Sequence, residues 1–220
     1  MIILFSNHTY GRQFARAFLA YCQEYAVTAR LVFSVFYGDQ QKHAQADAFI
    51  QDLKQTLRAG DRIQIEKAEV NGETFLTSLM QYQTPLHGVV AGFNQIFKAP
   101  LLSHFHSLVN IHPSLLPYYR GPVPSYWVIA KGERYTGFSL VTVGSEIDHG
   151  DILYQEVLEI TKDERPDTLD QKIASRAVPI MTAYLRHLAN GEDFASKTED
   201  AQAYLLHHVD YLSFPDKEQR

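Results

Sequence analysis

The stretch SLVNIHP, residues 107–113, begins as an apolar strand and ends on polar side chains. Asn110 and His112 are two residues apart, so on an extended chain they lie on one face while Ile111 points to the other. Pro113 disfavours the helical conformation for His112 and keeps it extended. The end of this strand therefore presents an amide and an imidazole side by side on a rigid support.

The chain on both sides of this strand alternates between apolar runs and segments of helical periodicity. Runs typical of strands lie at residues 1–6, 29–36, 61–70, 87–93, 107–113, 135–143 and 152–160. Helical patterns lie at residues 11–26, 40–60, 72–83, 124–133 and 165–191. Pro179 is expected to kink or interrupt the last of these helices. This alternation predicts an α/β fold with a mostly parallel sheet and helices on both faces, in which sites form at the C-terminal ends of strands.

The composition excludes several classes of protein. The chain has 220 residues, of which 45% are apolar and 20% charged, as in ordinary globular proteins. Cys22 is the only cysteine, so no disulfide can form within the chain, and this residue is expected to pack on a helix. The net charge of −5 and the lack of a Lys/Arg cluster argue against a nucleic-acid partner. Because no signal peptide or membrane-spanning run is evident, we expect no membrane association and a cytoplasmic protein.

The amide and the imidazole suggest a particular chemistry. An amide N–H and a protonated imidazole are both donors, and two converging donors stabilise an oxygen that gains negative charge. The imidazole needs an orienting carboxylate, and the turn GSEIDHGD offers Glu146, Asp148 and Asp151, among which spacing alone does not choose. The alternative is a packed pair at a strand end, followed by an ordinary Asp/Gly turn.

Two segments carry a family resemblance. The stretch NIHPSLLPYYRG, residues 110–121, followed by TGFSLVTVGSEIDHGDILYQ, residues 136–155, resembles the signature of the folate-dependent formyltransferases. That family includes glycinamide ribonucleotide transformylase, methionyl-tRNA formyltransferase and the sugar N-formyltransferases. The resemblance implies a Rossmann-like formyltransferase fold, a catalytic trio of Asn110, His112 and Asp148, the co-substrate 10-formyltetrahydrofolate and no metal.

The resemblance also implies binding residues. The pterin of the formyl donor is expected to lie against the backbone of two segments. The first consists of Val90, Ala91, Gly92, Phe93, Asn94 and Ile96. The second consists of Thr142, Val143, Gly144 and Ile147. Tyr118, Tyr119 and Arg120 follow the motif and are expected to contact the acceptor through stacking and a phosphate contact. Alternatively, both tyrosines cover the core and Arg120 bonds a backbone carbonyl.

The acceptor is expected to be a small amine. The segment SNHTYGRQ, residues 6–13, has only Gly11 where the glycinamide ribonucleotide enzymes have a glycine-rich phosphate loop. The segment RGPVPSYWVIAKGE, residues 120–133, resembles the tRNA and sugar branches, but the about 60 residues after the last strand are expected to be too few for the β-barrel domain of the tRNA enzymes. An amino sugar on a nucleotide carrier is therefore expected. The alternatives are a glycinamide ribonucleotide transformylase-like enzyme, a formyltetrahydrofolate hydrolase, and a non-catalytic folate-binding module.

The expected organisation is a catalytic domain at residues 1–190 and a C-terminal tail at residues 191–220. The tail is weakly patterned. The sequence leaves open whether the protein forms a homodimer and whether the tail takes part in it.

Overall fold

The computed structural model describes residues 1–7, 9–36 and 40–215. The chain forms two compact units. Unit 1 comprises Met1–Val109 and Val178–Asp193, and unit 2 comprises Asn110–Ala177 and Phe194–Arg220. Seven strands follow one another across the sheet in the order β3-β2-β1-β4-β5-β6-β7.

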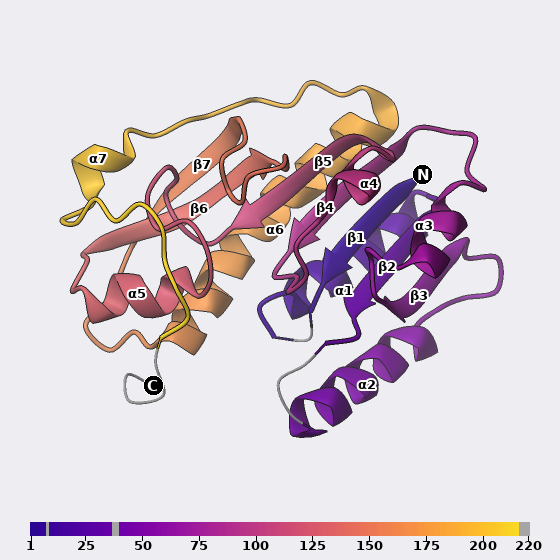
Figure 1. The fold of residues 1–220 in the computed structure, drawn as a ribbon, viewed down its shortest axis with the longest axis horizontal. Helices are drawn as coiled ribbons and strands as arrows, with labels where there is room; N and C mark the ends of the chain where they lie inside the picture. Colours follow the sequence, from indigo (N-terminus) through magenta and orange to yellow (C-terminus); the bar gives the residue numbers. More distant parts are fainter. Residues whose placement is uncertain (8, 37–39, 216–220) are drawn as a thin grey trace. The chain divides into compact units, whose positions relative to one another are not determined.

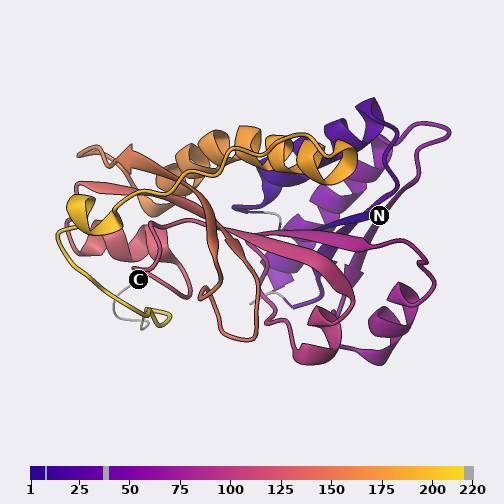
Figure 2. The same cartoon turned by 90° about the horizontal axis from the view of Figure 1, so that it is seen from above.

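Unit 1 holds the parallel part of the sheet (Figure 1). Its elements are β1 (Ile2–Ser6), α1 (Arg12–Glu24), β2 (Ala29–Ser34), α2 (Gln40–Gln55), β3 (Ile63–Ala68), α3 (Glu73–Leu79), β4 (Leu86–Ala91), α4 (Ala99–Leu102) and the first part of β5 (Phe105–His112). Strand β1 pairs in parallel with β2 and β4, and β2 pairs in parallel with β3. Every residue of β1 and β2 is buried, as the continuous apolar run of β1 predicted for that strand; in β2 the buried residues include Arg30. Helix α1 lies on one face of these strands and α3 and α4 lie on the other (Figure 2).

Unit 2 contains the end of β5, followed by α5 (Pro124–Ala130), β6 (Tyr135–Thr142), β7 (Ile152–Glu159), the first part of α6 (Pro166–Asn190) and α7 (Ala201–Tyr204). Strands β6 and β7 form an antiparallel pair that runs from Tyr135 opposite Glu159 to Val141 opposite Ile152. The loop between them carries the predicted turn GSEIDHGD. The end of β5 and this loop therefore belong to the same unit.

The predicted α/β class with a mostly parallel sheet is confirmed, with three differences in detail. Helices α4 and α7, four residues each, were not predicted. Helix α6 continues through Pro179, so the proline does not interrupt it. Buried residues on both sides of Pro179, such as Ala177 and Met181, continue the apolar pattern, and tertiary packing outweighs the one backbone hydrogen bond that proline removes.

The expectation that Cys22 packs on a helix is confirmed. Cys22 is buried on α1, and burial raises the pKa of its thiol to about 12, which makes it an inert packing residue.

Helix α6 ends at Asn190, next to the predicted domain boundary. The division into residues 1–190 and 191–220 stays a prediction. Within the described residues, no helix combines the length and apolar character needed to cross a membrane.

A buried arginine on β2 bonds a glutamate on β3. Arg30 is 2% exposed. Its Nε donates to Glu66 Oε1 at 2.7 Å, its Nη1 donates to Ser78 Oγ at 3.0 Å, and its guanidinium lies 4.8 Å from the centre of the Phe75 ring. The charge is therefore compensated by a carboxylate, a hydroxyl and an aromatic face.

Arg30→Ala is expected to lower the free energy of unfolding by about 3 kcal/mol, because it leaves the Glu66 carboxylate without its partner in a mostly buried site. Urea denaturation measures this change. The matched control is Arg16→Ala, which breaks an ion pair with Asp52 whose two side chains are 54% and 51% exposed, and which is expected to change stability by less than about 1 kcal/mol. Equal effects of the two substitutions would show that the Arg30 contacts contribute no more than a surface pair.

Candidate active site

Asn110, His112 and Asp148 meet around one carboxylate in unit 2. Asn110 Nδ2 donates to Asp148 Oδ1 at 3.1 Å, and His112 Nδ1 lies 3.4 Å from Asp148 Oδ2. The first two residues come from the end of β5 and the third from the loop between β6 and β7. The His112 side chain is 4% exposed and the Asp148 side chain 9% exposed, so solvent and salt screen their interaction only weakly.

Asp148 accepts two further hydrogen bonds. Gly121 N donates to its Oδ2 at 2.9 Å, and Arg120 Nε donates to its carbonyl oxygen at 3.1 Å. Asp148 has a φ of 56°, a left-handed conformation that residues with side chains adopt only where their surroundings enforce it. Gly121 has a φ of 90°, and a Cβ there would lie 2.9 Å from Leu212 O. The glycine of the motif therefore lets its N–H reach the carboxylate.

Of the three candidate carboxylates, the structure brings Asp148 to His112. Glu146 is 75% exposed and lies 3.5 Å from His149 Nδ1. Asp151 is exposed, and its backbone closes the loop: its carbonyl accepts from Thr142 N at 2.9 Å and its N–H donates to Thr142 Oγ1 at 2.8 Å. The geometry in the described part of the chain thus makes the choice that spacing left open.

Both ring nitrogens of His112 face oxygen atoms. Nε2 lies 2.8 Å from Tyr119 O, a hydrogen-bond distance, whereas the 3.4 Å from Nδ1 to Asp148 exceeds the usual N–H···O range. A ring protonated at both nitrogens has one donor for each oxygen. The Nδ1–H, which makes the longer contact, is therefore the donor that an incoming oxygen can take over.

Buried polar side chains fix the loop after β5. Ser139 Oγ donates to Ser114 O at 2.8 Å and accepts from Leu116 N at 3.0 Å. Gln155 Nε2 donates to Leu116 O at 2.8 Å and to Ser139 Oγ at 2.9 Å. Ser114, Ser139 and Gln155 are almost completely buried. Their hydrogen-bond network therefore holds the loop after β5, residues 113–123 (the motif loop), in one conformation. No pattern in the sequence points to this network, because its members lie far apart along the chain.

The three residues that follow the motif differ in accessibility. Tyr119 is completely buried and its hydroxyl donates to Glu133 Oε1 at 2.6 Å, so burial contradicts the expected acceptor contact of this side chain. Tyr118 is half-buried and stacks on His208 with ring centres 4.8 Å apart. Arg120 bonds the carbonyl oxygen of Asp148, as the alternative interpretation held. An acceptor contact stays a prediction for Tyr118 and Arg120.

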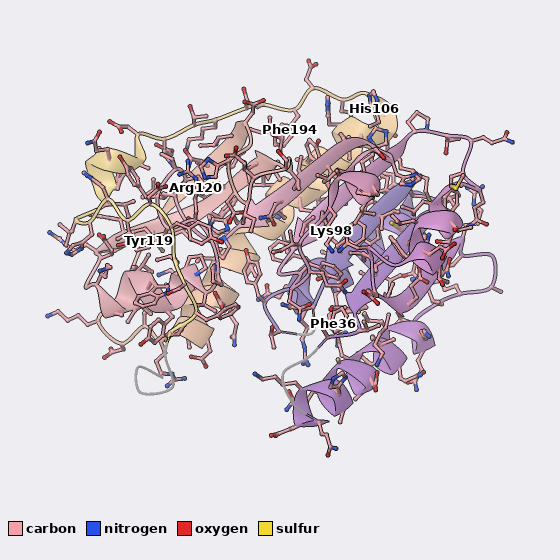
Figure 3. All side chains as sticks on the ribbon, in the orientation of Figure 1. Phe36, Lys98, His106, Tyr119, Arg120 and Phe194 are labelled. Atoms are coloured by element: carbon pink, nitrogen blue, oxygen red, sulfur yellow. The ribbon has the colours of Figure 1, made fainter. Side chains whose placement is uncertain are left out.

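The C-terminal strap, residues 205–213, runs beside the motif loop. Tyr119 N donates to Val209 O at 2.7 Å, and Leu212 N donates to Arg120 O at 2.8 Å. Arg120 also donates its backbone N–H to Asp210 O at 3.0 Å and forms an ion pair with the Asp210 carboxylate. Tyr119 and Arg120 are labelled in Figure 3 on the segment that follows β5. The strap therefore supports two residues whose backbone or side chain contacts the trio.

The strap also contacts the residues around the motif through side chains. Trp127 is half-buried and its indole N–H donates to Ser213 O at 2.9 Å. His207 N donates to Glu133 Oε1 at 2.8 Å, and the exposed His208 stacks on Tyr118.

A family comparison agrees with this geometry. A family model described as formyl transferase matches residues 7–185, which is more than half of the chain. The chain belongs to the formyl transferase family.

Curated relatives and solved structures support this membership. The methionyl-tRNA formyltransferase of Anaeromyxobacter sp. (strain K) is 36% identical over 118 residues, covering 53% of this chain and 38% of that protein. That of Caldanaerobacter subterraneus subsp. tengcongensis is 30% identical over 165 residues, covering 71% of this chain and 53% of that protein. The chain thus spans about half or less of the length of these relatives.

Two solved structures share the fold. A sugar N-formyltransferase from a Shewanella species has a TM-score of 0.69 at 16% identity, over 97% of this chain and 77% of that chain. Glycinamide ribonucleotide transformylase 1 from Symbiobacterium toebii has a TM-score of 0.64 at 20% identity, over 90% of this chain and 93% of that chain. At these identities the likeness establishes the formyl transferase fold.

The first segment expected to line the pterin lies in unit 1, at the end of β4. Val90 and Ala91 are almost completely buried. Gly92 has a φ of 69°, and a Cβ there would lie 2.8 Å from Tyr10 Cδ1. The remaining residues, Phe93, Asn94 and Ile96, are half-buried, exposed and 65% exposed, respectively. Asn94 and Ile96 are therefore the residues of this segment whose side chains are exposed to a ligand.

The second segment lies in unit 2 and leads into Asp148. Thr142 and Val143 are half-buried, whereas Gly144 is exposed and Ile147 is 39% exposed. A Cβ at Gly144 would meet no atom within 4 Å. The surface of this loop is therefore open at Gly144. Among the described residues no group of three or more His, Cys, Asp or Glu could hold a metal ion.

Proposed function

We propose that this chain transfers a formyl group from 10-formyltetrahydrofolate to the amine of a small acceptor. The observation that carries the proposal is the convergence of Asn110 and His112 on the Asp148 carboxylate. An amide donor, an imidazole donor and a carboxylate are the groups that acyl transfer to an amine needs. The proposal agrees with membership of the formyl transferase family.

The two donors act on the carbonyl oxygen of the formyl group. Asn110 uses one amide N–H on Asp148 and has a second for the oxygen that becomes negative when the amine attacks. His112 Nδ1–H supplies the other donor by exchanging its long contact with Asp148 for the stronger bond to an oxyanion. Because the oxygen gains charge only in the transition state, both bonds accelerate the reaction rather than merely tightening binding.

Asp148 moves the proton. It accepts the proton that the attacking amine loses as the new C–N bond forms, directly or through a water molecule. The folate donor supplies the activated formyl carbon and a leaving nitrogen to which that proton passes as the old C–N bond breaks. Two hydrogen bonds hold the carboxylate in place for this step, from Asn110 Nδ2 and Gly121 N.

We propose an amino sugar on a nucleotide carrier as the acceptor. Its support is the position of Tyr118 and Arg120 directly after the motif. The acceptor base would replace His208 against the Tyr118 ring, and an acceptor phosphate would replace the Asp210 carboxylate at Arg120. A ribonucleotide phosphate at the loop after β1 is disfavoured, because Asn7 Oδ1 already accepts from Thr9 N at 3.0 Å and Gly11 N at 2.8 Å. Those two backbone N–H groups are donors that a phosphate would otherwise use.

Methionyl-tRNA is the second candidate for the acceptor. Its support is the similarity to methionyl-tRNA formyltransferases, which reaches 36% identity over 118 residues. The net charge of −5 weighs against it, because binding to the phosphates of a nucleic acid usually depends on clustered cations.

The test measures tetrahydrofolate release from 10-formyltetrahydrofolate with a nucleotide-linked amino sugar, glycinamide ribonucleotide, methionyl-tRNA or no amine. Release that requires the amino sugar supports the proposal. Release only with methionyl-tRNA or with glycinamide ribonucleotide would show that this compound, and not the amino sugar, is the acceptor. Equal release without any amine indicates a hydrolase. Binding of the folate without any release indicates a non-catalytic module.

A further inference from the structure

A second buried carboxylate lies near the trio and has no part in the proposed reaction. Glu133, just after α5, is 5% exposed. It accepts hydrogen bonds from Tyr119 Oη at 2.6 Å, Leu206 N at 2.6 Å and His207 N at 2.8 Å. His207 Nδ1 also lies 3.3 Å from Oε1, so four polar contacts replace the water that a buried carboxylate would lose. Glu133 joins the motif loop to the first residues of the C-terminal strap.

Tyr119 carries this connection to the trio. Its hydroxyl bonds Glu133, while its carbonyl oxygen lies 2.8 Å from His112 Nε2 and accepts from Ser114 Oγ at 3.2 Å. Burial raises the pKa of the Tyr119 hydroxyl, and the bond to Glu133 raises it further, so this group remains a donor. The same residue therefore touches Glu133 through its side chain and His112 through its backbone.

The backbone of Tyr119 needs external support. Its φ of 58° is left-handed, which is strained for an aromatic residue. The conformation is held by Glu133 at the hydroxyl, by Val209 at the N–H, and by His112 and Ser114 at the carbonyl oxygen. Loss of the Glu133 contact would let the peptide relax, and the carbonyl oxygen that aligns the His112 ring would move.

We propose that Glu133 is a positioning residue for His112, acting through Tyr119. The strap provides the second support, because Val209 O accepts the Tyr119 N–H. Glu133 does not touch the reacting atoms. It fixes the peptide that keeps a hydrogen on His112 Nε2 and thereby leaves Nδ1 directed at Asp148. The kinetic consequence rests on the proposed formyl transfer, whereas the structural consequence does not.

The test is Tyr119→Phe, which keeps the buried ring and removes only the hydroxyl. In the full chain labelled with ¹⁵N-histidine, the His112 ring signals are expected to shift as the Nε2 hydrogen bond weakens. The kcat for formyl transfer is expected to fall on the order of tenfold, since small misplacements of a catalytic group are costly, with both KM values within about twofold. A folded variant with unchanged His112 signals overturns the proposal.

The matched control is Tyr21→Phe. Tyr21 is also buried, and its hydroxyl makes no hydrogen bond within the part of the chain that the structure describes. This substitution in unit 1 removes a buried hydroxyl without touching Glu133, so unchanged His112 signals and kcat are expected. Shifts equal to those of Tyr119→Phe would assign the effect to general loosening and overturn the proposal.

Glu133→Gln keeps the test decisive if Tyr119→Phe does not fold. An amide has one acceptor oxygen, so it cannot serve Leu206 N on one side and Tyr119 Oη with His207 N on the other. The His112 signals are expected to move in the same direction as in Tyr119→Phe, and unchanged signals overturn the proposal. If the unsubstituted chain transfers no formyl group, the proposed function fails, while the ¹⁵N measurement still decides the positioning role.

Discussion

Asp148→Asn is expected to lower kcat for formyl transfer by about 10³-fold, within the range for removal of a general acid–base group. The substitution removes the negative charge that faces His112 Nδ1 and the group that accepts the proton from the amine. It also converts one acceptor oxygen into an NH₂ group, which faces the donor of Asn110 if it replaces Oδ1 or that of Gly121 if it replaces Oδ2. Tetrahydrofolate release under saturating substrates measures the change.

The fold should survive this substitution, because asparagine tolerates a left-handed backbone such as the φ of 56° at this position. The controls are Glu146→Gln and Asp151→Asn, which remove the other two carboxylates of the same loop and are expected to leave kcat within about twofold, as surface substitutions away from buried contacts usually do. A mild effect of Asp148→Asn together with a large effect of either control would move the catalytic role to that residue.

The sequence predicted the parts of this protein that depend on apolar pattern and on chain direction. Strand β1 is a continuous apolar run, and such a run requires a sheet that is covered on both faces. Asn110 and His112 share a face because the side chains of a strand alternate. These features are local, so they can be inferred without knowledge of distant contacts.

The strap and Glu133 could not be predicted in this way. The strap is held by backbone groups of Tyr119, Arg120 and Leu212, and a backbone hydrogen bond leaves no mark on the choice of side chain. Glu133 stands in the segment KGER, which resembles an exposed turn. The return of residues 206 and 207 supplies two of the donors to this carboxylate, Leu206 N and His207 N.

His112→Asn is expected to lower kcat by about 10³-fold, the cost of losing a strong oxyanion donor. An asparagine side chain carries no positive charge and is too short to span the distance between Asp148 Oδ2 and Tyr119 O, which the imidazole contacts through opposite nitrogens. The KM for the formyl donor should change little, because the lost bond forms mainly in the transition state. His149→Asn is the matched control, since His149 lies beside Asp148 but is 42% exposed and faces Glu146.

The double variant His112→Asn with Asp148→Asn separates two accounts of the trio. If the two residues act as one unit, the double variant should be about as slow as the slower single variant, because the second substitution removes a group that no longer has its partner. If they act independently, the losses multiply to about 10⁶-fold. The 3.4 Å contact between His112 Nδ1 and Asp148 Oδ2, in a site where both side chains are less than 10% exposed, favours the first outcome. Multiplying losses would show that His112 stabilises the oxyanion without help from the carboxylate that faces it.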